Sequence, residues 1–423
     1  MTSNYKNITE CRICGCKDLE EAISLPHQFL SPTFVKTNKD NPLSDIKVPM
    51  TVLVCKNNDC SLVQLKESTN PALLYTNYFY RSATNEMMKK DLKNVVIRSQ
   101  EHVELKPNDI VVDIGANDCT MIQWFPESIK RIAVEPAKNI DWSDVDTSIN
   151  IVNDFFPSPK FISSLDGKKV KIFTSCAMFY DLDKPNDFVQ SVQQNLDKDG
   201  LWCIQLSYAL SMTKNLNFYD ICHEHLEYYT LKTLRFLMNK NGLHLYHAEE
   251  NRVNGGSALV FISHIDKKMT DSPELTNLLN EEKSMGLYEA DAYKIFFSRM
   301  NDLKFKVNTY IDNQIEKGNL VLGLGASTKG NVLLQFFGLN KQKIPAISEK
   351  QKSKAGLKTL GSDIDLISEK DAHLKNPSCM LVLPWYFKDE IVAREFEYIK
   401  NGGTLLFPMP YAHLVTKNGE VAL

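Results

Sequence analysis

A buried strand that runs into a glycine turn constrains the fold of the middle of this chain. The segment 109–117 reads Asp-Ile-Val-Val-Asp-Ile-Gly-Ala-Asn, and a helix is expected to open over 119–125. A second apolar strand, 131–135, ends in Glu135, twenty residues after Gly115. This spacing is typical of a nucleotide-type βαβ unit, in which the glycine lets a ligand approach the backbone and the strand-end acid accepts hydrogen bonds from ribose hydroxyls.

The single glycine of this turn gives poor support for a phosphate cradle. Class I methyltransferases use the same unit to bind S-adenosylmethionine, which has no phosphates to hold. Further strands at 168–176 and 199–206, a helix at 186–196 and a Gly-Gly turn before a last strand within 251–262 continue the alternation. The sequence therefore predicts an α/β domain over 73–268, with a helix near 87–103 at its start.

A second strand, glycine loop and helix start lie at 319–331, which reads Asn-Leu-Val-Leu-Gly-Leu-Gly-Ala-Ser-Thr-Lys-Gly-Asn. Free N–H groups at a helix N-terminus suit an anion. Lys329 adds positive charge, and Ser327, Thr328 and Asn331 add hydrogen bonds; the alternative for Lys329 is a solvated loop lysine. The loop is neither a Walker A nor a dinucleotide motif, so we expect it to bind a phosphate. Strands at 380–384 and 403–410 complete a smaller Rossmann-like domain over 319–423.

The two α/β regions are joined by a segment with helical periodicity, 269–318. Apolar residues recur there at three- and four-residue spacing: Tyr293, Phe296, Phe297, Met300, Leu303 and Val307. We expect one or two long helices that dock on a neighbouring domain.

Two cysteine pairs mark the N-terminal region, 1–72. Cys11 and Cys14 form a C-x2-C pair, and Cys55 and Cys60 form a C-x4-C pair between two strand-like segments. Four thiolates satisfy one tetrahedral zinc and leave no open position, so the predicted metal is structural. Cys16 could compete as a ligand, and a set of buried free cysteines is the alternative.

Composition limits the classes of partner. The 423 residues carry a net charge of −3, which gives no global drive toward nucleic acid or anionic membrane. No apolar run reaches the roughly 20 residues of a membrane-spanning helix. The N-terminus lacks a signal-peptide pattern, and we expect a cytoplasmic protein with reduced thiols.

The richest ionisable cluster is 218–230, which reads Phe-Tyr-Asp-Ile-Cys-His-Glu-His-Leu-Glu-Tyr-Tyr-Thr. It follows the 199–206 strand, on the edge where open α/β sheets bind substrates. A histidine beside a carboxylate is a workable general base, and His225 and His223 both qualify. The alternative is a helix N-terminus with aromatic packing. An aromatic segment at 75–80 could likewise pack or line a pocket.

Taken in order, the motifs resemble those of the sugar-nucleotide C-methyltransferases of deoxysugar biosynthesis. The series is a four-cysteine knuckle, Y-x-Y-R-S, D-I-G-A-N-D, C-H-E-H-L-E-Y-Y, V-N-G-G-S and G-x-G-A-S-T-K-G-N. The resemblance covers nearly the whole chain. It implies an S-adenosylmethionine site in the middle domain and an NDP-4-keto-deoxyhexose between the middle and C-terminal domains.

Site residues follow from the resemblance. His225 inherits the role of base and Glu224 a supporting role, with His223, Tyr78 and Tyr80 as further catalytic candidates. The expected cofactor residues are Asp113, Gly115, Ala116, Asn117, Glu135, Pro136, Asn153, Asp154 and Phe155. The expected substrate residues are Tyr208, Asn254, Ser327, Thr328, Lys329 and Asn331, with Lys329 as the cation of the diphosphate.

Two positions depart from the family pattern. Cys222 replaces the tyrosine that is assigned to reprotonation, which puts an epimerising proton return in question. Cys119 stands where glycine is usual.

Three functions remain open from the sequence. The first is C-methylation through proton abstraction beside a ketone, the second is O-methylation of a sugar hydroxyl, and the third is sugar-nucleotide binding without catalysis. The expected chain is a monomer or a weak homo-oligomer.

Overall fold

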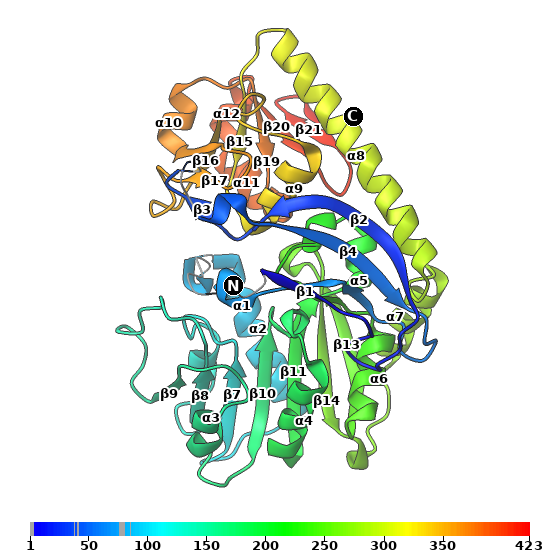
Figure 1. Ribbon diagram of the computed structural model, residues 1–423. Helices are drawn as coiled ribbons and strands as arrows, with labels where there is room; N and C mark the ends of the chain where they lie inside the picture. Colours follow the sequence, from blue (N-terminus) through cyan, green and yellow to red (C-terminus); the bar gives the residue numbers. More distant parts are fainter. Residues whose placement is uncertain (1–3, 38, 40–41, 76–80, 85) are drawn as a thin grey trace.

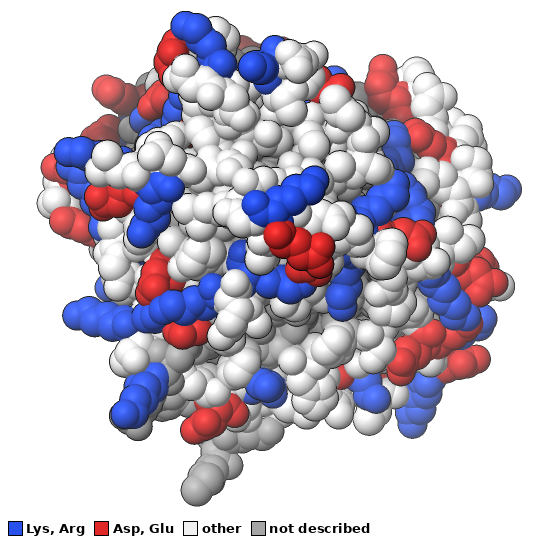
Figure 2. Space-filling model, turned by 90° about the horizontal axis from the view of Figure 1, so that it is seen from above, with Lys and Arg blue, Asp and Glu red and all other residues white. Residues whose placement is uncertain are grey.

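The computed structural model describes the chain except for residues 1–3, 38, 40–41, 76–80 and 85 (Figure 1). Its parts are an N-terminal region with two small sheets, a seven-stranded middle sheet, a helical connector and a C-terminal sheet. Acidic and basic side chains are interspersed on the face seen in Figure 2. Among the helices described, none is long and apolar enough to cross a membrane.

The middle sheet has the strand order β13-β14-β11-β10-β7-β8-β9. β14 runs antiparallel to both of its neighbours, and the other pairings are parallel. This is the order of a class I methyltransferase sheet, as predicted. The strands are β7 Ile110–Ile114, β8 Lys130–Val134, β9 Ile149–Val152, β10 Val170–Cys176, β11 Leu196–Ser207, β13 Leu243–Asn251 and β14 Ser257–His264.

The middle sheet is buried on both faces because its strands are continuous apolar runs. Along β7, Ile110, Val112 and Ile114 pack into one core, and Val111 packs into the other. The helices are α2 Glu86–His102, α3 Pro159–Ser164, α4 Pro185–Asn195, α5 Ala209–Lys214 and α6 Leu231–Lys240, and a short α1 (Pro71–Tyr75) precedes them.

One predicted helix of the middle region is wrong. The residues after the β7 turn form only a short 3-10 helix, η3 (Ile122–Trp124). Asn117 and Cys119 both have positive φ, which an α-helix does not allow, and Phe125 is extended before Pro126.

The C-terminal sheet has the order β22-β21-β20-β19-β15-β16-β18-β17-β3. Its parallel strands are β15 Val321–Leu324, β16 Ala346–Glu349, β18 Asp365–Ser368, β19 Cys379–Val382 and β20 Thr404–Phe407, and its other strands are β3 Phe34–Val35, β17 Lys358–Thr359, β21 His413–Thr416 and β22 Gly419–Ala422. The helices are α9 Thr328–Phe337, α10 Glu369–Leu374, α11 Lys388–Arg394 and α12 Phe396–Lys400.

Two strands pair across the predicted domain boundaries. β3 comes from the N-terminal region but pairs with β17 of the C-terminal sheet. β12 (Glu227–Tyr228) comes from the middle region but joins β5 in an N-terminal sheet of order β12-β5-β4-β2. The N-terminal strands are β1 Tyr5–Asn7, β2 Leu19–Phe29, β4 Lys47–Cys55, β5 Val63–Leu65 and β6 Glu67–Thr69. The predicted hairpin around the second cysteine pair is β4–β5.

The connector consists of two helices, α7 (Pro273–Ser284) and α8 (Ala290–Glu316). Most of the predicted apolar stripe of α8 is buried, including Tyr293, Phe296 and Met300, and it shares one core with Ile23, Leu25 and Val52 of the N-terminal region. In Figure 1, α8 runs from the C-terminal sheet down along β2. The N-terminal region therefore completes its core against the connector.

Candidate functional site

A cavity of about 710 Å³ is lined by the N-terminal, middle and C-terminal parts of the chain. It receives the turns after β7, β8 and β10, the segment 222–226, and the start of α9. Of the residues predicted from the sequence, those that line it are Asp113, Gly115, Ala116, Asn117, Glu135, Pro136, Phe155, His223, Glu224, His225, Asn254, Ser327, Thr328 and Lys329.

The β7 turn is held to the end of β8 by backbone and carboxylate hydrogen bonds. The N–H groups of Gly115 and Ala116 donate to the Val134 carbonyl at 2.9 and 3.1 Å. Glu135 accepts from the N–H of Asn117 and from that of Ala137, each at 2.8 Å. These bonds fix the carboxylate at the cavity wall, while a carboxylate has lone pairs for further donors.

Gly115 is required by both conformation and space. Its φ is +77°, and a Cβ built on it would lie 2.9 Å from Met178 Cγ. The backbone is therefore open to a ligand where a side chain would close the cavity. Together with the strand-end Glu135, this cradle fits the nucleoside part of S-adenosylmethionine.

Asp113 lies at the bottom of the same turn. Thr174 Oγ1 donates to its carboxylate at 2.9 Å. Burial raises the pKa of Asp113 to about 7, so part of the population is protonated at neutral pH and can donate a hydrogen bond.

Cys119 adopts a φ of +63°, the left-handed conformation that favours glycine. The family pattern has glycine at this position, and the chain keeps the backbone conformation although it has lost the residue. Its side chain packs in the core beneath the sheet.

The three residues after β9, Asn153 to Phe155, differ in whether they line the cavity or support a neighbouring loop. Asn153 Nδ2 donates to the carbonyls of Glu135 and Ala137 at 2.7 and 3.0 Å. Asp154 accepts from the Phe155 N–H. Neither Asn153 nor Asp154 lines the cavity, whereas the exposed ring of Phe155 does. Asn153 thus supports the loop that carries Glu135.

His225 is buried at the cavity wall with its ring 4.2 Å, centroid to centroid, from that of Tyr180. The imidazole is hydrogen-bonded to the Asp220 backbone carbonyl, so that ring nitrogen carries the proton. Burial lowers the pKa of His225 well below its ordinary value, and the positive charge of Lys329 adds to this shift. At neutral pH the ring is neutral, with its other nitrogen able to accept a proton.

His223 makes contacts of a different kind. Its Nε2 lies 3.3 Å from the Val48 carbonyl oxygen, and its Nδ1 lies 3.3 Å from Ser31 Oγ. Both ring nitrogens are therefore engaged with the N-terminal region. These contacts favour an anchoring role for His223 and leave His225 as the stronger candidate for the base.

Glu224 and Cys222 flank the histidines. Burial raises the pKa of Glu224 to about 7, and the Cys222 thiol is hydrogen-bonded to its carboxylate. Burial also raises the pKa of Cys222 well above its ordinary value, so the thiol stays protonated. The sulfur therefore acts as a weak donor where the family pattern has a phenol.

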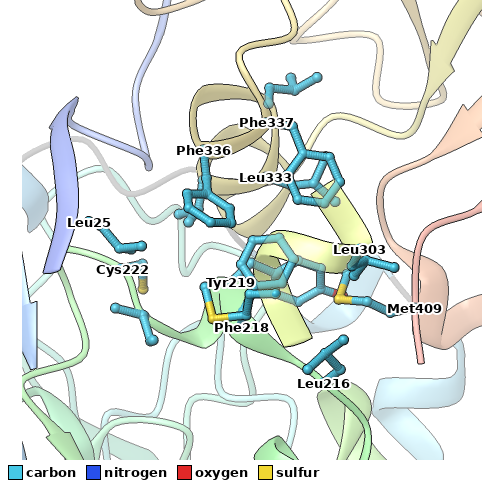
Figure 3. Packing of buried hydrophobic residues seen from close by; sticks show 14 of the residues in the cluster. Leu25, Leu216, Phe218, Tyr219, Cys222, Leu303, Leu333, Phe336, Phe337 and Met409 are labelled. Atoms are coloured by element: carbon cyan, nitrogen blue, oxygen red, sulfur yellow. The ribbon is translucent and has the colours of Figure 1, made fainter. Parts of the chain in front are cut away.

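The segment that leads to His225 is held by an apolar core shared by four parts of the chain (Figure 3). Phe218 stacks on Phe337 of α9, with centroids 5.4 Å apart. Cys222 lies in the same cluster, with Leu25 of β2 and Leu303 of α8. Packing of this kind limits the rotamers available to the segment and so fixes the position of His225.

Lys329 does not lie free at the helix start as the sequence analysis expected for a diphosphate cation. Its ammonium forms an ion pair with Asp220 of the middle domain. It also lies 3.5 Å from the Asn254 carbonyl oxygen and over the rings of Tyr219 and Tyr386, at 5.7 and 5.9 Å. The start of α9 is capped by Ser327, whose Oγ accepts from the Gly330 N–H.

Two predicted substrate residues point elsewhere. The Tyr208 hydroxyl is buried and donates to Glu282 of α7 at 2.8 Å. Asn331 Nδ2 donates to the Ser31 carbonyl at 2.8 Å. Neither residue lines the 710 Å³ cavity, and both tie elements together. Tyr78 and Tyr80 lie outside the described residues.

The four predicted zinc ligands gather at one point. The sulfurs of Cys11, Cys14, Cys55 and Cys60 all lie within 4.8 Å of one another, as a tetrahedral thiolate site requires. Cys16 is apart from them, with its sulfur 3.7 Å from the Asp18 carbonyl oxygen. The cluster packs against the middle-domain core and lies outside the cavity lining, in keeping with a structural metal.

Asp220 was missed by the sequence analysis. It is buried and serves His225 through its backbone and Lys329 through its carboxylate. The sequence carried one signal, since Asp220 belongs to the ionisable cluster, but its partner lies 109 residues further along the chain.

Two family models match the chain. The C-methyltransferase C-terminal domain matches residues 252–410, and the putative zinc binding domain matches residues 11–75. The chain is 27% identical over 419 residues to the C-methyltransferase NovU of Streptomyces niveus, covering 98% of this chain and 99% of that protein.

Solved structures resemble part of the chain. One is a complex of the Haloferax volcanii Trm112 methyltransferase activator with a putative methyltransferase, at 12% identity and a TM-score of 0.34 over 42% of this chain and 94% of that chain. Another is an S-adenosylmethionine-dependent methyltransferase from Clostridium acetobutylicum, at 11% identity and a TM-score of 0.34 over 42% and 92%. By these matches the chain is an S-adenosylmethionine-dependent methyltransferase that is similar over nearly its whole length to a C-methyltransferase and has a zinc-binding domain at residues 11–75.

Proposed function

We propose that this chain methylates a carbon next to the ketone of a nucleotide-linked 4-keto-deoxyhexose. The observation that carries the proposal is the neutral, buried His225 in the same cavity as the β7 turn and the start of α9. The substrate class rests on the resemblance of the ordered motifs to those of sugar-nucleotide C-methyltransferases.

The proposed first step is removal of the α-proton by His225. A ketone acidifies its neighbouring C–H, so a base with a low pKa can act on it when it is held in place. The hydrogen bond to the Asp220 carbonyl sets the tautomer and orients the free nitrogen. Glu224, about half protonated near pH 7, provides a nearby group that can share the proton.

The Gly115–Glu135 side of the cavity would hold the cofactor. When bound, S-adenosylmethionine supplies an electrophilic methyl group. The walls must bring the substrate carbon within roughly 3–3.5 Å of that methyl and exclude water. A cavity enclosed by three parts of one chain serves both requirements.

The sugar nucleotide would enter against the C-terminal side of the cavity. The start of α9 lines this side at Thr328, where free N–H groups of a helix N-terminus would favour an anionic group, and Asn254 lines it from the middle domain. Lys329 has another role in this arrangement, because its ammonium is engaged by Asp220.

The test is a panel of nucleoside-diphosphate 4-ketohexoses incubated with S-adenosylmethionine and purified enzyme. We expect one substrate to gain the mass of a methyl group in place of hydrogen, and a carbon–carbon bond to that methyl in the NMR spectrum. A methyl on oxygen would establish the O-methyltransferase alternative. Binding of a sugar nucleotide without turnover by any member of the panel would favour the non-catalytic alternative.

A further inference from the structure

The cavity brings a lysine of the C-terminal domain next to the base of the middle domain, and one residue holds both. Asp220 accepts from the His225 ring through its backbone carbonyl and pairs with the Lys329 ammonium through its carboxylate. His225 and Lys329 both line the cavity, and the charge of the ammonium acts on the imidazole. A lysine that only bound a distant diphosphate would not need to lie near His225, as Lys329 does.

The reaction proposed above leaves a specific charge unaccounted for. When His225 takes the α-proton, the C–H electron pair forms a carbon–carbon double bond, and the carbonyl π electrons move to oxygen. The resulting enolate oxygen is negative, and in a cavity poor in water it needs a fixed donor or cation. The α-hydrogen and the carbonyl oxygen are three bonds apart, so the base and the donor must approach the ketone together.

We propose that Lys329 is this donor, stabilising the enolate oxygen while His225 removes the proton. An ammonium has three N–H groups. Lys329 has two acceptors in the structure, the Asp220 carboxylate and the Asn254 carbonyl, which leaves one N–H for a ligand in the cavity. The proton stays on Lys329 throughout, and the negative charge leaves the oxygen when the carbon bonds to the methyl group.

The surroundings of Lys329 hold its side chain in place. Asp220 is almost fully buried and is itself held by Asn217 Nδ2, which donates to its other oxygen at 2.8 Å. The rings of Tyr219 and Tyr386 lie within 6 Å of the ammonium, a distance at which an aromatic face attracts a cation. Ser327 caps α9 one residue before Thr328, which fixes the backbone from which the lysine projects.

The competing explanation is that Lys329 only neutralises Asp220. A buried carboxylate that loses its partner is strongly destabilising, so a single Lys329 variant could fail for structural reasons. The double variant Lys329→Met/Asp220→Asn removes both charges at once and restores neutrality. It therefore separates neutralisation from catalysis.

The inference rests on the proposed function, and the test uses the proton-transfer half of that reaction. Enzyme, the 4-keto sugar nucleotide and S-adenosylhomocysteine, which lacks the methyl group, are placed in deuterium oxide, and exchange of the α-proton is followed by NMR. We expect wild-type enzyme to exchange it, and Lys329→Met and the double variant to lose about 10²- to 10³-fold in the exchange rate at saturating substrate. Substrate affinity should change by less than about tenfold.

A matched control comes from another ion-paired lysine of the C-terminal domain. Lys343 pairs with Asp312 of α8, away from the cavity lining. Lys343→Met should exchange at the wild-type rate. Thermal unfolding of every variant reports whether the fold is kept, and if Lys329→Met does not fold, the double variant alone decides.

Other outcomes overturn specific statements. No exchange by wild-type enzyme with any 4-keto substrate would reject the proposed function, and the inference with it. Exchange by wild type together with near-wild-type exchange by the double variant would show that Lys329 only neutralises Asp220. If the Lys329 variants had a raised Michaelis constant and an unchanged rate at saturation, Lys329 would instead bind the diphosphate, as the sequence analysis expected.

Discussion

The β7 turn of the middle sheet and the β15 turn of the C-terminal sheet are built in the same way. Gly115 and Gly325 both have positive φ, of +77° and +80°. Glu135 and Glu349 each end the next strand of their sheet. Glu349 accepts from the Ala326 N–H at 2.9 Å and from the Gln351 N–H at 2.7 Å, much as Glu135 accepts from the N–H groups of Asn117 and Ala137 at 2.8 Å.

The two turns differ in what covers them. Glu135 and its turn line the cavity, whereas Glu349 does not. Lys354 Nζ donates to the Ala326 carbonyl at 3.0 Å and lies over the ring of Phe34 from the N-terminal region. On this side the start of α9 and Tyr386 reach the cavity. The two turns thus share one design, but the β7 turn lines the cavity together with its acid, whereas the β15 turn brings a helix start to it.

The largest expected effect tests whether the chemistry belongs to the middle sheet. His225→Ala should lower the rate of methyl transfer by at least about a hundredfold, because a positioned base contributes about 10²–10⁴. His223→Ala should lose less, since His223 is engaged by Ser31 and Val48. Single-turnover kinetics measures both, with calorimetry to show that the ligands still bind. A larger loss of rate in His223→Ala than in His225→Ala would indicate that His223 is the base and that His225 has the anchoring role.

The next effect compares the two strand-end acids directly. Glu135→Ala should weaken S-adenosylmethionine binding by about ten- to hundredfold, because charge-assisted hydrogen bonds contribute about 1.5–3 kcal/mol. Glu349→Ala loses the same backbone partners in the other sheet and should leave this affinity nearly unchanged. Calorimetric titration of the two variants measures the S-adenosylmethionine affinity. Equal weakening in both would contradict the assignment of the cofactor to the β7 turn.

Zinc removal should act unequally on the two sheets. The four cysteines pack into the core of the middle domain, with Phe179, Tyr229 and Leu231. Chelation, or Cys11→Ser, should lower the thermal midpoint and increase hydrogen exchange around β12 and α6 before it affects β15 and β19. Hydrogen-exchange mass spectrometry and metal analysis provide the measurement. Well under one zinc per chain in protein purified without chelator would contradict the site.

The smallest expected effect concerns pH. Because the pKa of His225 in the folded protein is lowered, the active neutral ring persists as pH falls below 6.5 and is lost only when pH passes the lowered value. The acid limb of kcat/KM should therefore have its midpoint below 6.5. Lys329→Met removes one cause of the lowering, so the midpoint should rise. An unchanged midpoint would show that the charge of Lys329 does not influence the pKa of His225.

Features written in local sequence were predictable. The paired cysteines needed only short turns to aim their sulfurs, and the β7 and β15 turns followed from apolar runs that end in glycine. The pattern also showed that Cys119 replaces a glycine, although not that the backbone would keep its left-handed conformation. The predicted helix after it was wrong because two positive φ angles and Pro126 outweigh helical propensity.

What the sequence did not reveal depends on how distant segments dock. The Asp220–Lys329 pair joins the middle and C-terminal domains, and the Ser31–His223 contact joins the N-terminal region to the middle domain. Glu349 was partly predictable. It lies 24 residues after Gly325, so the spacing that identified Glu135 could also have identified Glu349. The spacing could not predict that Lys354 and Phe34 cover this turn.

The position of β12 limits how such an enzyme can be recombined. Glu227 follows His225 by two residues and pairs with Gln64 of β5, and its buried carboxylate lies 3.7 Å from Arg12 Nε, between two of the cysteines. The N-terminal region therefore helps to position His225. A chimera that exchanges this region without residues 218–230 would pair mismatched strands beside His225. When new methyltransferases are made by recombining relatives, the N-terminal region and residues 218–230 should be exchanged together, although about 150 residues separate them in the sequence.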